Sequence, residues 1–169
     1  TGAAAGNYSL TSVGTTTANI TALGITGSFA ADNKVYDATT DAVVLFTDLT
    51  GFFATDDVSL DGGIATFDTK NADLNKIVTL TGAGLIGVDA GNYSLLSVAT
   101  TTADIDALGI TGSFTADNKV YDATTTASVL TQTLAGVIGI DDVSLIGGTA
   151  DFDTKNADLN KIVTLTGAG

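Results

Sequence analysis

The chain has 169 residues, carries six Lys against 19 Asp, and contains no His, Cys, Met, Trp, Pro, Arg or Glu. Its net charge of −13 repels a phosphate backbone and an anionic lipid surface, so neither nucleic acid nor a membrane is an expected partner. Without His, Cys or Glu, catalysis would depend on Asp, Lys, Ser, Thr or Tyr, and no nucleophile–base arrangement is visible. We therefore expect no enzymatic activity and no cofactor, apart from the calcium ion considered below.

An 85-residue repeat runs through the chain. Residues 30–40 return as residues 115–125 with one change, and the same offset aligns Asn7 with Asn92 without a gap. Length alone allows one domain or two. The repeat predicts two units of about 85 residues, each large enough to bury a modest core.

The N-terminal residues resemble the end of a repeat. The matching pairs are residues 7–10 with 92–95 and residues 15–20 with 100–105. The second copy stops at Gly169, before any counterpart of this closing stretch. The chain is therefore expected to begin and end in mid-unit.

Two arrangements of the repeats are compatible with these ends. The first has closing strands of a preceding repeat at 1–23, a complete repeat at 24–108 and a second repeat without its closing strands at 109–169. It describes either a window cut from a longer array or a chain that forms a head-to-tail homopolymer by strand addition between molecules. The alternative has two permuted units at 1–84 and 85–169.

From residue 24 onward, short runs of Val, Ile, Thr, Phe and Tyr alternate with Gly, Asn and Asp, which predicts strands and tight turns and no helix. The predicted strands are Ile25–Phe29, Lys34–Tyr36, Ala42–Leu45, Val58–Leu60, Ile64–Phe67, Ile77–Thr81, Tyr93–Val98 and Thr101–Ile105. Val78 and Leu80 alternate with Thr79 and Thr81, so one face of that strand can enter a core while the other meets water. The pattern predicts a layered all-β unit.

The connections between strands are also predictable. Gly62-Gly63 suits a tight hairpin that needs positive φ, and residues 71–75 form a polar loop before a strand. The joint between the repeats, near residues 104–109, has no proline. The strand-like run at residues 100–105 nevertheless favours a stiff joint.

Several motifs in order carry a family resemblance. They are Lys34-Val35-Tyr36-Asp37-Ala38-Thr39-Thr40, Asp56-Asp57-Val58-Ser59-Leu60, Lys76-Ile77-Val78-Thr79-Leu80-Thr81-Gly82, Ala90-Gly91-Asn92-Tyr93-Ser94-Leu95 and Thr102-Ala103-Asp104-Ile105. They resemble the YDG and MBG repeats of large bacterial surface proteins and filamentous-haemagglutinin-like adhesins. The resemblance implies tandem Ig-like β-sandwich repeats, an extracellular stalk at the bacterial cell surface, and no catalytic residues.

The chain departs from that pattern at two kinds of position. Ala38 and Ala123 stand where the family name implies Gly, which predicts that the turn after Asp37 does not need positive φ. Asp106 and Ala107 stand where such repeats often carry Pro, which leaves the junction between units less stiff.

Composition agrees with an exported protein and raises the question of calcium. Acidic charge with abundant Thr, Ser, Gly and Ala is typical of proteins that stay soluble outside a cell and of those that bind Ca²⁺ there. The adjacent carboxylates of Asp56-Asp57 and Asp141-Asp142 are candidate Ca²⁺ ligands, because such pairs repel unless a cation or solvent screens them. Solvated loop charge is the competing explanation. The run at 68–75 lacks the Gly and terminal ligand of an EF-hand.

The two copies differ mainly between residues 41 and 66, where Phe46 and Phe52-Phe53 have no aromatic counterpart. If the protein is a ligand-binding adhesive module, the variable segment 41–61 would carry the contacts, and these three phenylalanines would be partly exposed. If it is a stalk or spacer, they would be buried in the core.

The tyrosines of the repeat, Tyr36, Tyr93 and Tyr121, are expected in the core with hydrogen-bonded hydroxyls. Sugar-stacking platforms are the alternative role for them.

Overall fold

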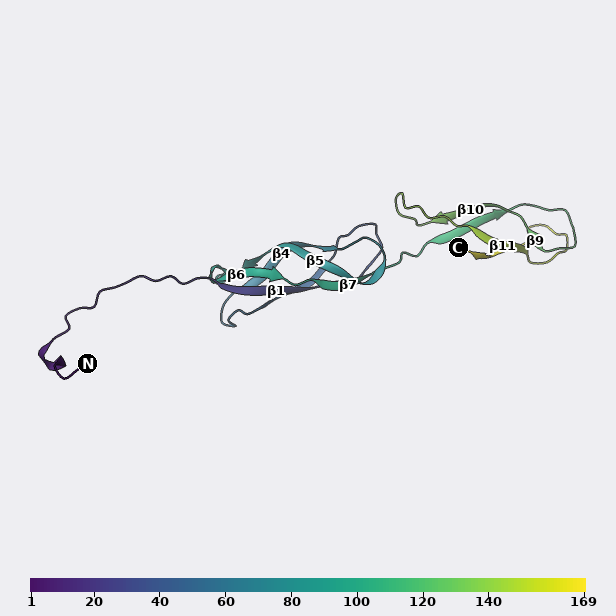
Figure 1. Cartoon of the computed structure of the whole chain (residues 1–169). Coiled ribbons are helices and arrows are strands. Elements are labelled where there is room, and N and C mark those ends of the chain that lie inside the picture. Colours follow the sequence, from purple (N-terminus) through teal and green to yellow (C-terminus); the bar gives the residue numbers. More distant parts are fainter.

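A computed structural model describes all 169 residues, and its regular structure is almost entirely β-strand (Figure 1). The only helical segments are two three-residue 3₁₀ turns, Ala5–Asn7 (η1) and Ala90–Asn92 (η2). Neither approaches the length that an apolar helix needs to cross a bilayer. The all-β prediction is confirmed.

Residues 23–106, here called the first module, contain seven strands. They are β1 (Leu23–Ala31), β2 (Lys34–Val35), β3 (Val44–Thr50), β4 (Ser59–Phe67), β5 (Asp73–Ile86), β6 (Tyr93–Val98) and β7 (Thr101–Asp106). One sheet has the order β3-β1-β6, and the other has the order β2-β7-β5-β4. Two pairs are parallel, β1 with β6 and β2 with β7, and the other neighbours are antiparallel.

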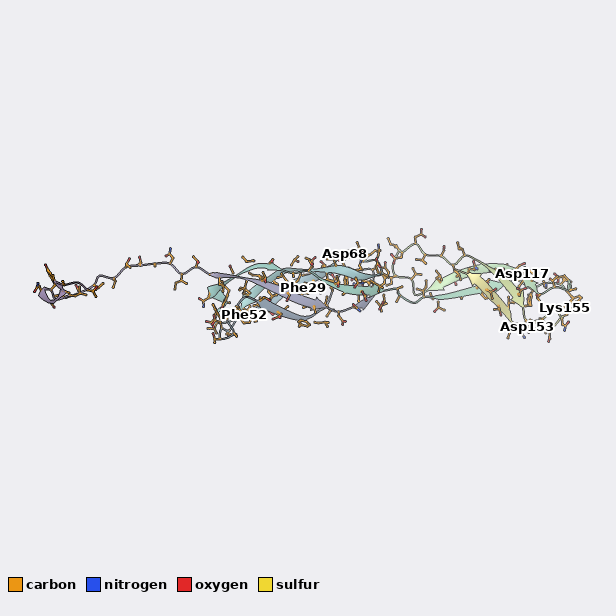
Figure 2. The ribbon with its side chains drawn as sticks, turned by 60° about the horizontal axis from the view of Figure 1, so that its bottom comes forward. Phe29, Phe52, Asp68, Asp117, Asp153 and Lys155 are labelled. Carbon is orange, nitrogen blue, oxygen red and sulfur yellow. The ribbon has the colours of Figure 1, made fainter.

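Two hydrophobic clusters lie between these sheets, one after the other along β1. The larger cluster joins Phe29 of β1 to Phe67 and Val78 of the facing sheet, and the smaller joins Ile25 of β1 to Tyr93 and its neighbours. Figure 2 shows Phe29 midway along the module. Burial of each large apolar side chain stabilises the fold by roughly 1.5 to 3 kcal/mol.

Residues 109–169, here called the second module, contain five strands. They are β8 (Thr111–Ala116), β9 (Thr126–Ala127), β10 (Val129–Ala135), β11 (Gly147–Phe152) and β12 (Val163–Ala168). They form the sheets β10-β8 and β12-β11-β9, in which no strand occupies the positions of β6 and β7. Ala150 is the one buried residue of this module, and Phe114 and Phe152 are only half-buried.

The two modules lie end to end, joined by residues 107–110 (Figure 1). Residues 1–22, here called the N-terminal segment, extend away from the opposite end of the first module. They contain no strand and are exposed throughout. The strands that close the first module are therefore β6 and β7 rather than their sequence counterparts in the N-terminal segment.

The prediction of a hairpin at Gly62-Gly63 is wrong. Both glycines lie inside the single strand β4, with φ of 71° and 89°, and β4 pairs with β5 on either side of them. Gly82, on the facing stretch of β5, also has a positive φ of 75°. Glycines with positive φ in paired strands mark a local kink in the ladder, so two predicted strands merge into one.

The prediction that the turn after Asp37 avoids positive φ is also wrong. Ala38 and Ala123 adopt left-handed backbone, with φ of 65° and 64°. The Thr39 N–H donates to the Asp37 carboxylate at 2.9 Å, and the Lys34 amine donates to the same oxygen at 2.8 Å. These bonds close the turn and force the intervening residue into the left-handed region, although it carries a Cβ.

Candidate functional site

The variable segment exposes two of its three phenylalanines. Phe46 on β3 is 62 % exposed and Phe53 in the following loop is 66 % exposed. Phe52 instead packs against the smaller core cluster (Figure 2). Two of the three phenylalanines are therefore exposed, as expected for a binding module, and one is packed in the core, as expected for a stalk.

Phe46 and Phe53 lie at opposite ends of the sheet. Phe46 pairs with Ala30, whereas the Phe53 N–H donates to the hydroxyl of Tyr93, which pairs with Leu23. Ala30 and Leu23 are seven residues apart on β1, or about 23 Å at 3.3 Å per residue. The two exposed rings do not form one continuous patch.

In the first predicted calcium pair, Asp56 and Asp57, both carboxylates already accept hydrogen bonds from the chain itself. The Tyr93 hydroxyl donates to Asp56 at 2.6 Å, which raises the pKa of Tyr93. Asp57 accepts the Val88 N–H at 3.2 Å, and its own N–H donates to Asp89 at 2.9 Å. These contacts fasten the 51–58 loop to the start of β6, which is a structural role.

The second predicted pair lies at the joint between the modules. Tyr36 of the first module donates its hydroxyl to Asp141 Oδ2 at 2.6 Å, and Lys70 Nζ lies 3.4 Å from Asp141 Oδ1. The hydrogen bond from Tyr36, followed by the bond from Lys70, lowers the pKa of Asp141. Asp142 beside it is exposed and makes no hydrogen bond or ion pair. One member of the pair therefore links the modules and the other faces solvent.

Nowhere in the chain do three or more carboxylates gather into a group that could hold a metal ion. Calcium binding by Asp56, Asp57, Asp141 and Asp142 stays a prediction.

Lysine–aspartate contacts recur at the same places in both modules. The Nζ–Oδ1 distances are 2.8 Å for Lys34–Asp37 and Lys119–Asp122, 2.9 Å for Lys76–Asp68 and 2.6 Å for Lys161–Asp153. The lysine contact and the bonds from Thr39 lower the pKa of Asp37 to about 2. Lys76 is buried within the four-stranded sheet, and its amine reaches Asp68 at the module surface.

A groove of about 430 Å³ opens at the far end of the second module. It runs between the loop that follows β8 and the segment that precedes β12, and Figure 2 shows Asp117, Asp153 and Lys155 at this end. Tyr121, which lines it, is exposed, so its predicted place in the core is wrong. Tyr93 is buried with a bonded hydroxyl, as predicted.

One family model matches the chain in two segments. The model, described as a YDG domain, covers residues 16–103 and 106–169. The chain belongs to the YDG domain family. No curated protein and no solved structure matches this YDG chain.

Sequence reasoning missed the joint contact of this YDG chain. Tyr36 and Asp141 are 105 positions apart, and each was assigned to a different role: core aromatic and calcium ligand. The duplication carried a partial signal, because Asp141 is the counterpart of Asp56, which accepts a tyrosine hydroxyl in the first module.

Proposed function

We propose that the chain is a non-enzymatic extracellular structural repeat that acts as a stalk, spacer or fibre segment of a bacterial surface adhesin. In this proposal each complete repeat is an Ig-like β-sandwich of about 85 residues, and its partners are the neighbouring repeats of the same protein. The YDG family match and the resemblance to surface-protein repeats support it. So do the lysine contacts and left-handed alanines that recur 85 residues apart.

The observation that carries the proposal is the joint. The modules lie end to end, and only four residues separate β7 from β8. Across that link Asp141 meets both Tyr36 and Lys70, and Lys70 lies 5.9 Å from the Tyr36 ring centroid. A short link with charge-assisted hydrogen bonds limits bending, which is what a spacer between two points requires.

Distance measurements between the modules test this role. Because the chain has no cysteine, Thr79→Cys and Thr164→Cys place one spin label on an exposed strand position of each module. A spacer predicts one narrow distribution of label separations, and Asp141→Asn should broaden it. The matched control is Asp142→Asn, which removes the same charge from a side chain without a partner. A broad distribution in the unaltered chain contradicts a stiff spacer.

The cell-surface location has its own test. Antibodies raised against residues 1–169 should label intact cells of the source bacterium as strongly as permeabilised cells. Labelling that appears only after permeabilisation would contradict an extracellular stalk.

The exposed Phe46 and Phe53 support a second candidate, a ligand-binding adhesive module with contacts in residues 41–61. The second copy supplies a guide for its test, since Thr131 replaces Phe46 there. Binding to a panel of glycans and matrix proteins should be lost in a Phe46→Thr, Phe53→Ser variant if these rings carry the contacts. Binding retained by that variant would contradict this candidate.

A further inference from the structure

We propose that the free edge of β3 in the first module binds an extended cationic segment of another protein, which adds to the β3-β1-β6 sheet as a further strand. The segment has β-branched residues in its middle and Lys or Arg near each end. The inference rests on the second candidate function, a ligand-binding module, and names the partner class and the contact surface. It leaves the spacer role of the joint unchanged.

The outer edge of β3 has no strand beside it. β3 pairs with β1, from Thr26–Thr50 to Ala31–Val44, and it is the terminal strand of its sheet. The backbone N–H and C=O groups of the other edge therefore have no strand partner within the module. Such a row of unpaired groups is a template for a further strand.

A β-bulge turns two large apolar side chains of this strand to solvent. Ala30 pairs with Phe46 and Ala31 pairs with Val44, so Leu45 is an extra residue in the ladder. Ordinary alternation would turn either Leu45 or Phe46 toward the core. With the bulge, these two side chains are 57 % and 62 % exposed. Bulges beside functional sites re-aim side chains in this way, and a docked strand would cover both.

Carboxylates without a lysine partner surround the apolar stretch. Asp41 precedes it and Asp48 follows it, and both side chains are exposed. A third, Asp61, is close in space, because it follows Leu60, whose carbonyl accepts the Thr47 hydroxyl at 2.8 Å. None of the five ion pairs of the chain includes these aspartates. An apolar strip with acidic ends is complementary to a segment with an apolar middle and basic ends.

Charge also decides against a second copy of the chain as the occupant. Two copies would each bring −13 charges, and pairing of β3 with β3 would bring the same carboxylates together. Five of the six lysines are already held by aspartates, so the chain has little positive charge to offer to the edge. A cationic segment would instead meet opposite charge at both ends and gain ladder hydrogen bonds.

The second module has the same edge without the carboxylates and without the ring. Its strands keep the bulge, since Val129 pairs with Ala116 and Thr131 with Thr115. The side chains Asp41, Val43, Phe46, Asp48 and Asp61 have the counterparts Thr126, Ser128, Thr131, Thr133 and Ile146. Three charges and one aromatic ring are thus exchanged together on a shared backbone. The fold does not require them, which leaves recognition as the role that they share.

Three synthetic peptides test the inference by fluorescence anisotropy with the full chain. The first alternates Thr and Val and has Lys at both ends, so that it fits either strand direction. The second has Glu in place of Lys, and the third keeps Lys but has Pro in its middle, which cannot donate to a ladder. We expect the second and third to bind about tenfold more weakly than the first, and added salt to weaken the first. Equal binding of the three peptides overturns the proposal.

Variants of the chain locate the contact. Phe46→Thr installs the residue of the second module and should weaken binding of the Lys peptide about tenfold or more, because an apolar anchor is lost. Asp41→Asn with Asp48→Asn should weaken it too and reduce its salt dependence. The matched control, Asp142→Asn with Asp158→Asn, removes two charges from exposed side chains of the second module and should bind as the unaltered chain does. Equal losses in the two charge variants would mean attraction to an acidic chain without a site, which overturns the proposal.

NMR spectra of the isotope-labelled chain give a readout that a loss of fold would not imitate. The Lys peptide should shift the signals of residues 44–50 and slow amide exchange along β3, while residues 129–135 stay unchanged. Changes centred on the Phe53 loop or on the second module overturn the proposal.

Failure of this inference is distinguishable from failure of the second candidate function. If no peptide binds but the chain binds a glycan or matrix protein of the panel, the module has a ligand of another class, and only the inference is overturned. If neither peptide nor panel binds, both fail. Sedimentation velocity without peptide adds one more outcome: a dimer that Phe46→Thr dissociates would assign the edge to a second copy and overturn the inference.

Discussion

Replacing Ala38 with glycine should stabilise the first module. Ala38 is held at φ 65° by the bonds between Asp37, Thr39 and Lys34. An L-residue in this region costs about 1 to 2 kcal/mol, because its Cβ approaches the following carbonyl oxygen. Glycine avoids that cost but gives the unfolded chain extra freedom, which offsets about 0.4 to 1 kcal/mol. We expect Ala38→Gly to raise the free energy of unfolding by about 0.5 to 1 kcal/mol.

Thermal unfolding followed by circular dichroism measures this gain. For a module of this size, such a change raises Tm by roughly 3 to 6 °C. Ala123→Gly should act in the same direction in the second module, and the two gains should add because the sites are far apart. Ala54→Gly is the control, since Ala54 is exposed without positive φ and should lose stability. A fall in Tm for Ala38→Gly as large as that for Ala54→Gly would refute the reasoning.

Three other outcomes are expected. Gly87→Ala would place a Cβ 2.2 Å from the Asp57 carbonyl oxygen at φ 118°, so it should lower stability by about 3 kcal/mol, whereas Gly91→Ala, with open space around it, should not. Acid should unfold the chain partly through Asp37 and Asp122, whose pKa is about 2 in the folded chain against 3.8 for a free aspartate. The free energy of unfolding that these two carboxylates add is therefore complete above about pH 4 and is lost as the pH falls toward 2. The calcium hypothesis for the Asp56 pair requires Tm to rise between chelator and millimolar Ca²⁺, and an unchanged melting curve removes it.

Strand positions were predictable because alternation and turn residues are local signals. The segments around Ile25–Phe29, Tyr93–Val98 and Thr101–Ile105 match β1, β6 and β7 closely. Gly62-Gly63 misled the prediction, because a hairpin turn and a kink inside a strand both need positive φ. Only the register with β5, in which Gly62 pairs with Ala83 and Ile64 with Thr81, distinguishes the two.

The candidate site was less predictable than the strands. Adjacent carboxylates at 56–57 and 141–142 look alike in sequence, yet Asp56 meets a tyrosine of its own module and Asp141 meets Tyr36 of the preceding one. Which tyrosine contacts each carboxylate is decided by packing between segments 37 and 105 residues apart, which no local pattern reveals. The left-handed Ala38 has a different cause: its side chain disfavours the conformation, and the neighbouring hydrogen bonds impose it.

The parallel pairing of β1 with β6 determines how the first module would respond to a pulling force. β1 is the first strand of the module, and β6 and β7 are the last, so tension along the chain draws β1 one way and β6 the other. Because the strands run in the same direction, they would slide past each other rather than peel apart, and the rungs from Leu23–Tyr93 to Gly27–Val98 would bear the load together. Peeling would break the rungs one at a time, whereas shear must break them all at once. The parallel topology therefore predicts that the module unfolds under tension only at a higher force than peeling strands would require.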